Sequence, residues 1–218
     1  MNLIDFKNVS VSYGDFIALK DISLKISKGE KIALIGPSGA GKSTLLRKIH
    51  ESLELDTTFI HQDFALVKQL SVFHNVYMGK LHKESVFKNI RNLLIPEKEE
   101  ISAVTPILSD LMLEDKIHEK TAALSGGQQQ RTAIARAFYS PADIVLGDEP
   151  VSSQDPENTE KVISMIMNHK ETVILSLHNV DAALSCAKRL IGVKDGNIFF
   201  DTTPNKVSDE QIKELYSQ

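Results

Sequence analysis

The run from Gly36 to Ser43, GPSGAGKS, constrains the fold of this chain more than any other segment. It follows the apolar run Lys31 to Ile35, which has strand character, and it leads into a segment with helical periodicity. Glycines in such a loop let successive backbone N–H groups turn inward around a phosphate, and the start of the helix adds partial positive charge. The order of strand, glycine-rich loop and helix therefore predicts an α/β fold that binds a nucleoside triphosphate.

Side chains in and beyond this loop predict hydrolysis as well as binding. The Lys42 ammonium can bridge the outer phosphates, and the Ser43 hydroxyl can coordinate Mg²⁺. Asp148 and Glu149 end the apolar run Ile144 to Leu146, which lets Asp148 hold Mg²⁺ while Glu149 faces the attacking water. Two acidic residues at a strand end usually do no more than face solvent. The presence of the phosphate loop in the same chain supports a catalytic role for Asp148 and Glu149. The residues of the loop predicted to bind the nucleotide are Gly36, Pro37, Ser38, Gly39, Ala40, Gly41, Lys42, Ser43 and Thr44.

Composition narrows the class of protein. With 218 residues, 42% of them hydrophobic, the chain is long enough for one sizeable core. A formal net charge of −4 provides no overall basic field, which argues against nucleic acid as a partner. The first ten residues lack a basic start followed by an apolar run, and no stretch approaches the roughly 20 apolar residues that cross a bilayer. We therefore expect a cytoplasmic protein, in which the single cysteine, Cys186, is an inert helix residue.

Hydrophobic periodicity predicts one domain, residues 1–218, with two lobes. Alternation in the first thirty residues indicates short strands, and apolar runs near Ile144 to Leu146 and Thr172 to Leu177 indicate strands of a buried sheet. A hairpin turn is expected at Asp195 and Gly196. Helical spacing dominates from Leu66 to Phe138. We expect a nucleotide-binding core with a β lobe over about 1–62 and 139–218, and a helical lobe over about 63–138.

The segment Leu124 to Arg131, LSGGQQQR, resembles the signature of the ATP-binding subunits of ABC transporters. It precedes the helical run Thr132 to Phe138, so a hydroxyl and backbone donors gather at a positive helix end and form a second anion site. A helix cap alone is the alternative interpretation. The resemblance implies a P-loop ATPase homodimer in which this segment meets the ATP of the opposite subunit. The residues assigned to that contact are Ser125, Gly126, Gly127, Gln128 and Asp155.

Further single positions match the same family. The resemblance implies that Tyr13 stacks on adenine, that Gln62 reaches Mg²⁺ and the attacking water, and that His178 contacts the terminal phosphate. Asp155 matches the loop that crosses between subunits, and Glu149 becomes the base or water-orienting residue. The implied cofactors are ATP and Mg²⁺. The catalytic set is Glu149, His178, Gln62 and Lys42, and the metal ligands are Ser43, Gln62 and Asp148.

Two features depart from the family pattern. The interval between Thr44 and Gln62 is short, and the glycine-turned strand hairpin normally found there cannot be identified, so we expect a trimmed antiparallel lobe. Gln154 replaces an apolar residue in the subunit-crossing loop, where we expect an effect on the dimer contact.

The run Phe64 to Leu81 and the segment DEPVSS, Asp148 to Ser153, are similar to phosphonate importer ATPases. The resemblance implies import of phosphonate or a related phosphorus oxyanion, with integral membrane permease subunits and an extracytoplasmic substrate-binding protein as partners. The chain would then act peripherally at the cytoplasmic face of the inner membrane. Two alternatives stay open: the ATPase of an exporter or lipoprotein-release complex, and a soluble mechanoenzyme of translation or DNA repair. The latter usually carries two cassettes or a long coiled-coil insertion, and neither pattern is visible here.

Overall fold

The computed structural model describes residues 1–151 and 156–217, except for the side chains of residues 156–158. The chain forms two compact units, each of which is described by itself. Unit 1 comprises Met1–Thr57 and Asp143–Gln218, and unit 2 comprises Thr58–Ala142. The sequence predicted a helical lobe over about 63–138, which begins and ends a few residues inside unit 2.

Five strands of unit 1 pair in one sheet, in the order β5-β6-β3-β7-β8. They are β5 (Ile144–Asp148), β6 (Thr172–Ser176), β3 (Lys31–Ile35), β7 (Arg189–Lys194) and β8 (Asn197–Thr202). The first four are parallel to one another, and β8 is antiparallel to β7. Every residue of β5 and β6 is buried, as expected for strands covered on both faces. The carboxyl ends of β3, β5 and β6 therefore meet at one edge.

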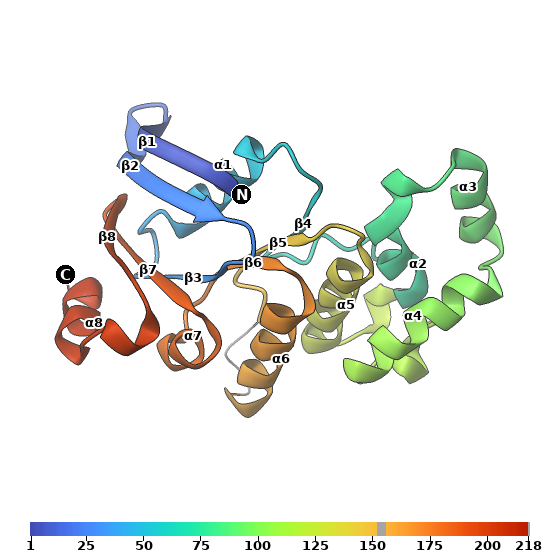
Figure 1. The fold of residues 1–218 in the computed structure, drawn as a ribbon. Coiled ribbons are helices and arrows are strands. Elements are labelled where there is room, and N and C mark those ends of the chain that lie inside the picture. The colour runs from blue at the N-terminus through green and yellow to red at the C-terminus, as the bar shows by residue number, and fades with distance from the viewer. Residues whose placement is uncertain (152–155, 218) are drawn as a thin grey trace. The chain divides into compact units, whose positions relative to one another are not determined.

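Helices and a hairpin cover the two faces of this sheet (Figure 1). Helix α1 (Lys42–Ser52) and the hairpin of β1 (Asn2–Tyr13) with β2 (Phe16–Ser27) lie on one face, while α6 (Pro156–His169) and α7 (Val180–Cys186) lie on the other. The hairpin strands are longer than the sequence predicted, because register shifts let the pairing continue past irregular positions. A 3₁₀ turn, η4 (Pro204–Lys206), and α8 (Asp209–Tyr216) complete unit 1.

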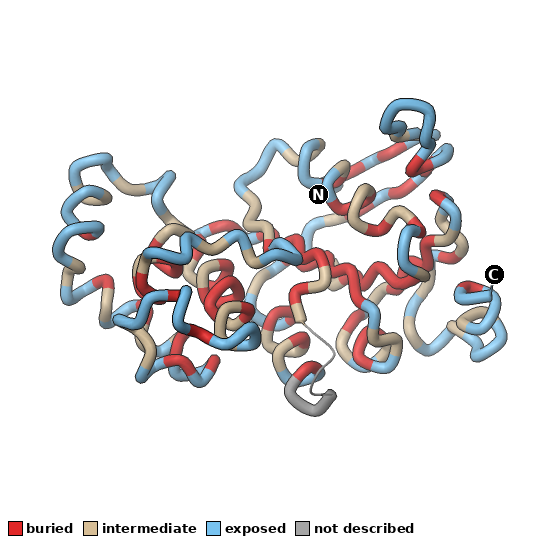
Figure 2. Tube along the Cα trace, turned by 180° about the vertical axis from the view of Figure 1, so that it is seen from behind, coloured by how far each residue is buried: buried red, intermediate tan, exposed pale blue. Residues whose placement is uncertain are grey.

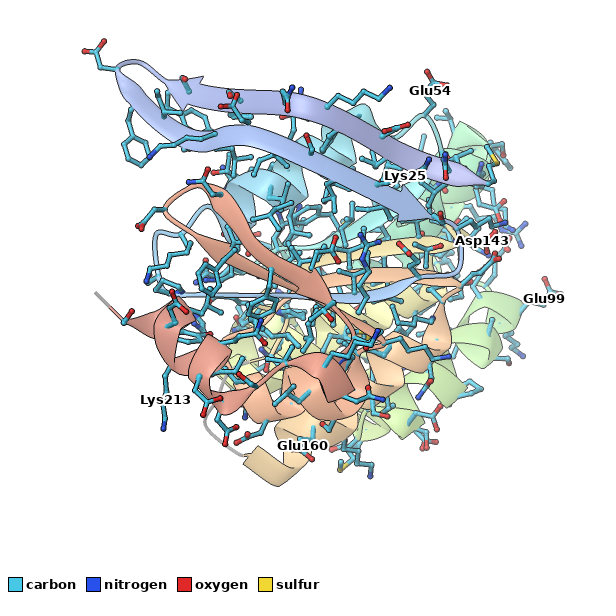
Figure 3. The ribbon with its side chains drawn as sticks, turned by 60° about the vertical axis from the view of Figure 1, so that its left-hand side comes forward. Lys25, Glu54, Glu99, Asp143, Glu160 and Lys213 are labelled. Carbon is cyan, nitrogen blue, oxygen red and sulfur yellow. The ribbon has the colours of Figure 1, made fainter. Side chains whose placement is uncertain are left out.

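Charged side chains of unit 1 are divided between surface and interior. Lys25 of β2 is exposed, and Figure 3 shows Glu160 of α6 and Lys213 of α8 pointing away from the sheet. By contrast, Lys42 and Asp148 are 5% and 6% exposed. Because burying an ionised group is costly unless it is paired or hydrogen-bonded, two buried charges of opposite sign mark this region for a function other than packing.

The connection after α1 confirms the trimmed antiparallel lobe. Only residues 53–56 join α1 to β4 (Thr57–Ile60), which leaves no room for a further strand hairpin. Strand β4 begins at the last residue of the first segment of unit 1 and continues in unit 2.

Unit 2 is a helical bundle around α5 (Gly126–Tyr139), which packs against α2, α4 and η1. The remaining elements are α2 (Val72–Tyr77), η1 (Met78–Lys83), α3 (Val86–Leu94), α4 (Lys98–Asp110), η2 (Glu114–Lys116) and η3 (Thr121–Ala123). Val104, Leu108 and Leu111 of the predicted helical stripe are buried. No helix in the described parts of the chain is long and apolar enough to cross a membrane.

Helix α3 is attached to unit 2 through its polar side. Asn92 is fully buried and lies within hydrogen-bonding distance of the Tyr77 hydroxyl, and Lys88 binds Glu100 of α4 at 2.9 Å. Burial alone would raise the pKa of Glu100, but hydrogen bonds from Lys80, Tyr139 and Lys88 outweigh it and hold that pKa at about 2. The carboxylate therefore stays ionised near neutral pH and secures α3.

The apolar side of α3 faces outward. Val86, Phe87 and Leu94 are 74%, 79% and 75% exposed, and Ile90 is 53% exposed. Figure 2 shows the trace of this helix mostly in the colour of exposed residues. An exposed apolar helix face of this kind is unusual for a packed unit and indicates an interaction surface.

Candidate active site

The phosphate loop connects β3 to α1 and is shaped by two glycines. At Gly36, with φ of 148°, an added Cβ would lie 2.0 Å from the Val193 carbonyl oxygen. Gly41, with φ of 106°, leaves only 2.8 Å between such a Cβ and the Ala18 carbonyl oxygen. Side chains are excluded at both positions, so the loop packs closely against β2 and β7. The first turn of α1 holds no acidic residue, which leaves the positive helix end suited to an anion.

The Lys42 ammonium is held against the loop by main-chain oxygens. Its Nζ donates hydrogen bonds to the carbonyls of Gly36 at 2.8 Å and Pro37 at 2.9 Å. Burial lowers the pKa of Lys42, and the charges of Glu149 and Asp148 oppose this effect. A cation placed beside the helix end concentrates positive charge where phosphates would bind.

Ser43 and Asp148, both predicted metal ligands, come together in unit 1. The Ser43 hydroxyl donates to Asp148 Oδ1 at 2.9 Å. A hydroxyl and a carboxylate are hard oxygen donors of the kind that Mg²⁺ prefers. Among the described residues no group of three or more histidine, cysteine or acidic side chains could hold a metal. The pair thus fits Mg²⁺ bound partly by nucleotide phosphates and water, the usual arrangement for this ion.

Glu149 and His178 form a second pair beside the first. His178 Nε2 lies 2.7 Å from Glu149 Oε1, and the histidine side chain is 50% exposed against 20% for the glutamate. Glu149 has a φ of 49°, in the left-handed region that costs a non-glycine residue about 1 kcal/mol or more. Such strain is commonly found where a side chain must be aimed for function. The structure therefore joins the predicted water-orienting carboxylate to the predicted phosphate-contacting histidine.

Tyr13 lies at the turn end of the β1–β2 hairpin. Its side chain is 55% exposed, and it pairs across the turn with Phe16, which is 64% exposed. An exposed aromatic ring can stack on a base.

The remaining predicted residues belong to unit 2 or lie outside the described residues. Gln62 is exposed in a turn that follows β4, and Gly126 and Gly127 are exposed in the first turn of α5. Asp155 and Gln154 lie outside the described residues.

Helix α5 starts earlier than the run from Thr132 that the sequence indicated. The reason is a capping box, in which the Ser125 hydroxyl accepts from the Gln128 N–H at 3.4 Å and Gln128 Oε1 accepts from the Ser125 N–H at 2.9 Å. Ser125 does act as a helix cap, as the alternative interpretation proposed. The first turn of α5 contains no acidic residue, so the cap and an anion site are compatible.

The sequence interpretation missed Arg136. Its guanidinium donates to the carbonyls of Phe64 at 2.8 Å and Ala65 at 2.7 Å, both of which have positive φ. Burial lowers the pKa of Arg136, and the charge of Asp63 opposes that effect. Arg136 thus ties the turn that follows Gln62 to the helix that begins after Ser125. The sequence did offer a signal for this role, since Arg136 interrupts the otherwise apolar run Ala133 to Phe138.

The sequence relatives share one family. The family model described as ABC transporter matches residues 19–152. The phosphonates import ATP-binding protein PhnC 3 of Halalkalibacterium halodurans is 35% identical over 246 residues, spanning 99% of this chain and 95% of that protein. Phosphonates import ATP-binding protein PhnC of Staphylococcus aureus is 34% identical over 248 residues, spanning 100% of this chain and 96% of that protein.

Solved structures agree with the sequence relatives. A nucleotide-free ATP-binding cassette from an ABC transporter has a TM-score of 0.73 at 23% identity and covers 99% of this chain and 95% of that one. The dimeric structure of a bacterial ABC transporter cassette has a TM-score of 0.75 at 27% identity, covering 91% and 97% respectively. The chain therefore belongs to the ABC transporter family, as one of its ATP-binding proteins, which hydrolyse ATP.

Proposed function

We propose that this chain is the ATPase subunit of an importer of phosphonate or a related phosphorus oxyanion. The observation that carries the hydrolytic role is the cluster at one edge of the sheet, where the phosphate loop, the Ser43–Asp148 pair and the Glu149–His178 pair lie in one unit. The cargo is taken from the names of relatives such as PhnC 3. In this proposal the two units together make one ATP-binding domain.

Each residue of the cluster has a distinct chemical role in the proposed hydrolysis. Lys42 and the amino end of α1 bind the phosphates, and Ser43 with Asp148 would hold Mg²⁺. That ion, when bound, neutralises charge that develops on the phosphates. Glu149 orients the attacking water and accepts its proton, and His178, whose Nε2 lies 2.7 Å from Glu149 Oε1, would turn to contact the terminal phosphate as the family pattern implies.

The second anion site at Ser125 supports a homodimer in which each active site uses two chains. The exposed glycines and the capped start of α5 provide backbone donors. The phosphate loop at Lys42 has donors of its own, so those of α5 would serve the ATP of the opposite chain. The dimeric cassette at 27% identity is a precedent for such pairing. Tyr13, Gln62 and Asp155 would contact the nucleotide, the metal and the opposite subunit as the family pattern implies.

Mixing two inactive variants tests this composite site. Ser125→Arg obstructs the second anion site, and Lys42→Ala damages the phosphate loop, so we expect each variant alone to lose nearly all ATP turnover. In mixed dimers one of the two sites is intact, because its phosphate loop comes from the first variant and its Ser125 from the second. Turnover should reappear on mixing, measured as phosphate release. A mixture as inactive as its components, under conditions where wild-type chains dimerise, would contradict the composite site.

We further propose that a permease docks on the outward face of α3 and the groove beside it. The groove has a volume of about 330 Å³ and lies within unit 2. Val86, Ile90 and Leu93 of α3 form one wall, and Met78 and Leu81 of η1 line the other. An apolar groove beside a helix suits a short amphipathic helix, such as one in a cytoplasmic loop of a membrane subunit. As part of the same proposal, the chain acts peripherally at the cytoplasmic face of the inner membrane, with a substrate-binding protein outside, as the family resemblance implies.

A charge placed in the groove tests the docking proposal. Ile90→Glu should reduce co-purification with the membrane subunits at least about tenfold, since a carboxylate would be buried without a partner. ATP turnover of the isolated chain should stay within about twofold of wild type, because surface substitutions outside the site change little. Met112→Glu is the matched control, since Met112 is also an exposed apolar residue of unit 2, at 56%. Equal recovery of the subunits with both variants would contradict docking here.

The identity of the co-purified membrane subunits also separates import from the exporter and lipoprotein-release alternatives. Recovery of a permease that has no associated substrate-binding protein would overturn the proposed direction of transport.

A further inference from the structure

We infer that Ser176 is a positioning residue for ATP hydrolysis, whose hydroxyl holds Asp148 and Glu149 in a single arrangement. The inference rests on the roles proposed above for these two acids and adds a residue to which neither the family pattern nor the phosphate loop points.

The Ser176 hydroxyl joins the two acids by two hydrogen bonds of opposite direction. It donates to Asp148 Oδ1 at 2.7 Å and accepts from the Glu149 backbone N–H at 2.9 Å. Ser176 ends β6, pairs directly with Asp148 of the parallel strand β5, and is 0% exposed. One buried oxygen atom thus contacts both the proposed metal ligand and the residue that carries the proposed water-orienting carboxylate.

The contact to Asp148 sets the direction of its carboxylate. Oδ1 accepts from Ser176 at 2.7 Å and from Ser43 at 2.9 Å. Donors that reach one oxygen from β6 and from α1 restrict rotation of the carboxylate between them. Groups that orient a metal ligand in this way commonly change metal affinity or activity by about 10–100-fold when removed.

The contact to Glu149 stabilises a strained backbone. With φ of 49°, Glu149 leaves the preferred regions directly after the strand ends, and its N–H also lies 3.3 Å from the Ser176 carbonyl. The hydrogen bond to the Ser176 hydroxyl, at 2.9 Å, is shorter than the contact to the carbonyl and therefore restrains this N–H more strongly. The same turn brings the Glu149 carboxylate to His178 at 2.7 Å. Loss of the hydroxyl should therefore disturb the aim of Glu149 as well as that of Asp148.

Ser176→Ala tests the inference, because it removes the hydroxyl and leaves the strand able to pair. We expect kcat to fall about 10–100-fold. Binding of a fluorescent, non-hydrolysable ATP analogue in EDTA should stay within about twofold, since the phosphate loop is unchanged, whereas the tightening of that binding by Mg²⁺ should fall about tenfold. The Mg²⁺-linked change in nucleotide affinity is an equilibrium measurement that general loss of stability does not predict.

Two further variants separate positioning from packing. Ser140 is a buried serine of unit 2, 4% exposed, whose hydroxyl accepts from the Ala142 N–H at 3.3 Å. Ser140→Ala should lower the melting temperature similarly without changing the Mg²⁺-linked affinity. Ser176→Thr retains the hydroxyl and should recover most of the Mg²⁺-linked affinity that Ser176→Ala loses, which supplies a second measurement should the alanine variant fold poorly.

Wild-type kcat and Mg²⁺-linked affinity in a folded Ser176→Ala variant would overturn the inference. So would equal losses of Mg²⁺-linked affinity in the Ser176→Thr and Ser176→Ala variants. If Glu149→Gln abolishes turnover while Ser176→Ala does not alter it, the proposed site stands and only the role of Ser176 fails. If Glu149→Gln turns over normally, the proposed site itself fails.

Discussion

Glu149→Gln should lower ATP turnover by about a thousandfold, within the range that a positioned general base contributes. The amide keeps the size of the carboxylate but cannot accept a proton from water, so the chemical step is lost while the site keeps its shape. Because ATP then persists between two chains, we also expect the variant to elute as a dimer in ATP and Mg²⁺. Phosphate release and light scattering measure the two effects.

The control for this variant is Glu171→Gln. Glu171 is a surface glutamate of the same unit, with a 50% exposed side chain that pairs with Lys28 at 2.9 Å. The loss of an exposed ion pair costs little, so its turnover should match wild type. Undiminished turnover of the Glu149→Gln variant would show that another group orients the water, and loss of turnover without any ATP-dependent dimer would separate catalysis from pairing.

Lys42→Ala should weaken ATP binding about 30–150-fold, because removing a charged partner from a buried, hydrogen-bonded contact costs roughly 2–3 kcal/mol. The Gly36 and Pro37 carbonyls restrict the Lys42 side chain, so phosphate binding costs little conformational entropy at this residue. Titration with a fluorescent ATP analogue measures the affinity directly.

Lys48→Ala is the matched control for charge and helix. Lys48 lies further along the same helix α1, beyond its first turn, so its removal leaves the phosphate loop intact. We expect nearly unchanged affinity. A similar loss in both variants would indicate a general electrostatic effect of lysines on α1, and wild-type affinity of the Lys42→Ala variant would overturn the assigned role of Lys42.

Local chemistry explains why the phosphate loop could be predicted. Gly36 and Gly41 need positive φ and have no room for a side chain, so their place in the sequence indicates the conformation of the loop. The adjacent apolar run and the helix that starts at Lys42 follow from residues within a few positions. The segment Leu124 to Arg131 likewise contains the residues that set its local structure. They start α5 at Gly126 through a capping box, earlier than the expected start near Thr132.

Contacts between distant segments could not be predicted in the same way. The Ser43–Asp148 pair joins residues 105 positions apart, and the parallel register of β5 with β6 sets Ser176 opposite Asp148. Arg136 reaches carbonyls more than 70 positions earlier. Such contacts depend on which strands and helices become neighbours, and a parallel sheet leaves that order to crossover helices and not to local turns.

Helix α3 shows the same division in unit 2. Its periodic apolar residues predict an amphipathic helix, and periodicity alone would place the apolar side inward. The ion pair of Lys88 with the buried Glu100 instead secures the polar side of α3, and its apolar side is left exposed.

By itself, the sequence determined the family and the phosphate loop, because closely spaced residues carry these features, and its resemblance to the family predicted the candidate catalytic residues. Only the tertiary structure decided which hydroxyl reaches Asp148, which histidine meets Glu149 and which face of α3 is exposed. The physical reason is that hydrogen bonds and ion pairs act over about 3 Å, a separation set by the packing of elements that lie far apart along the chain.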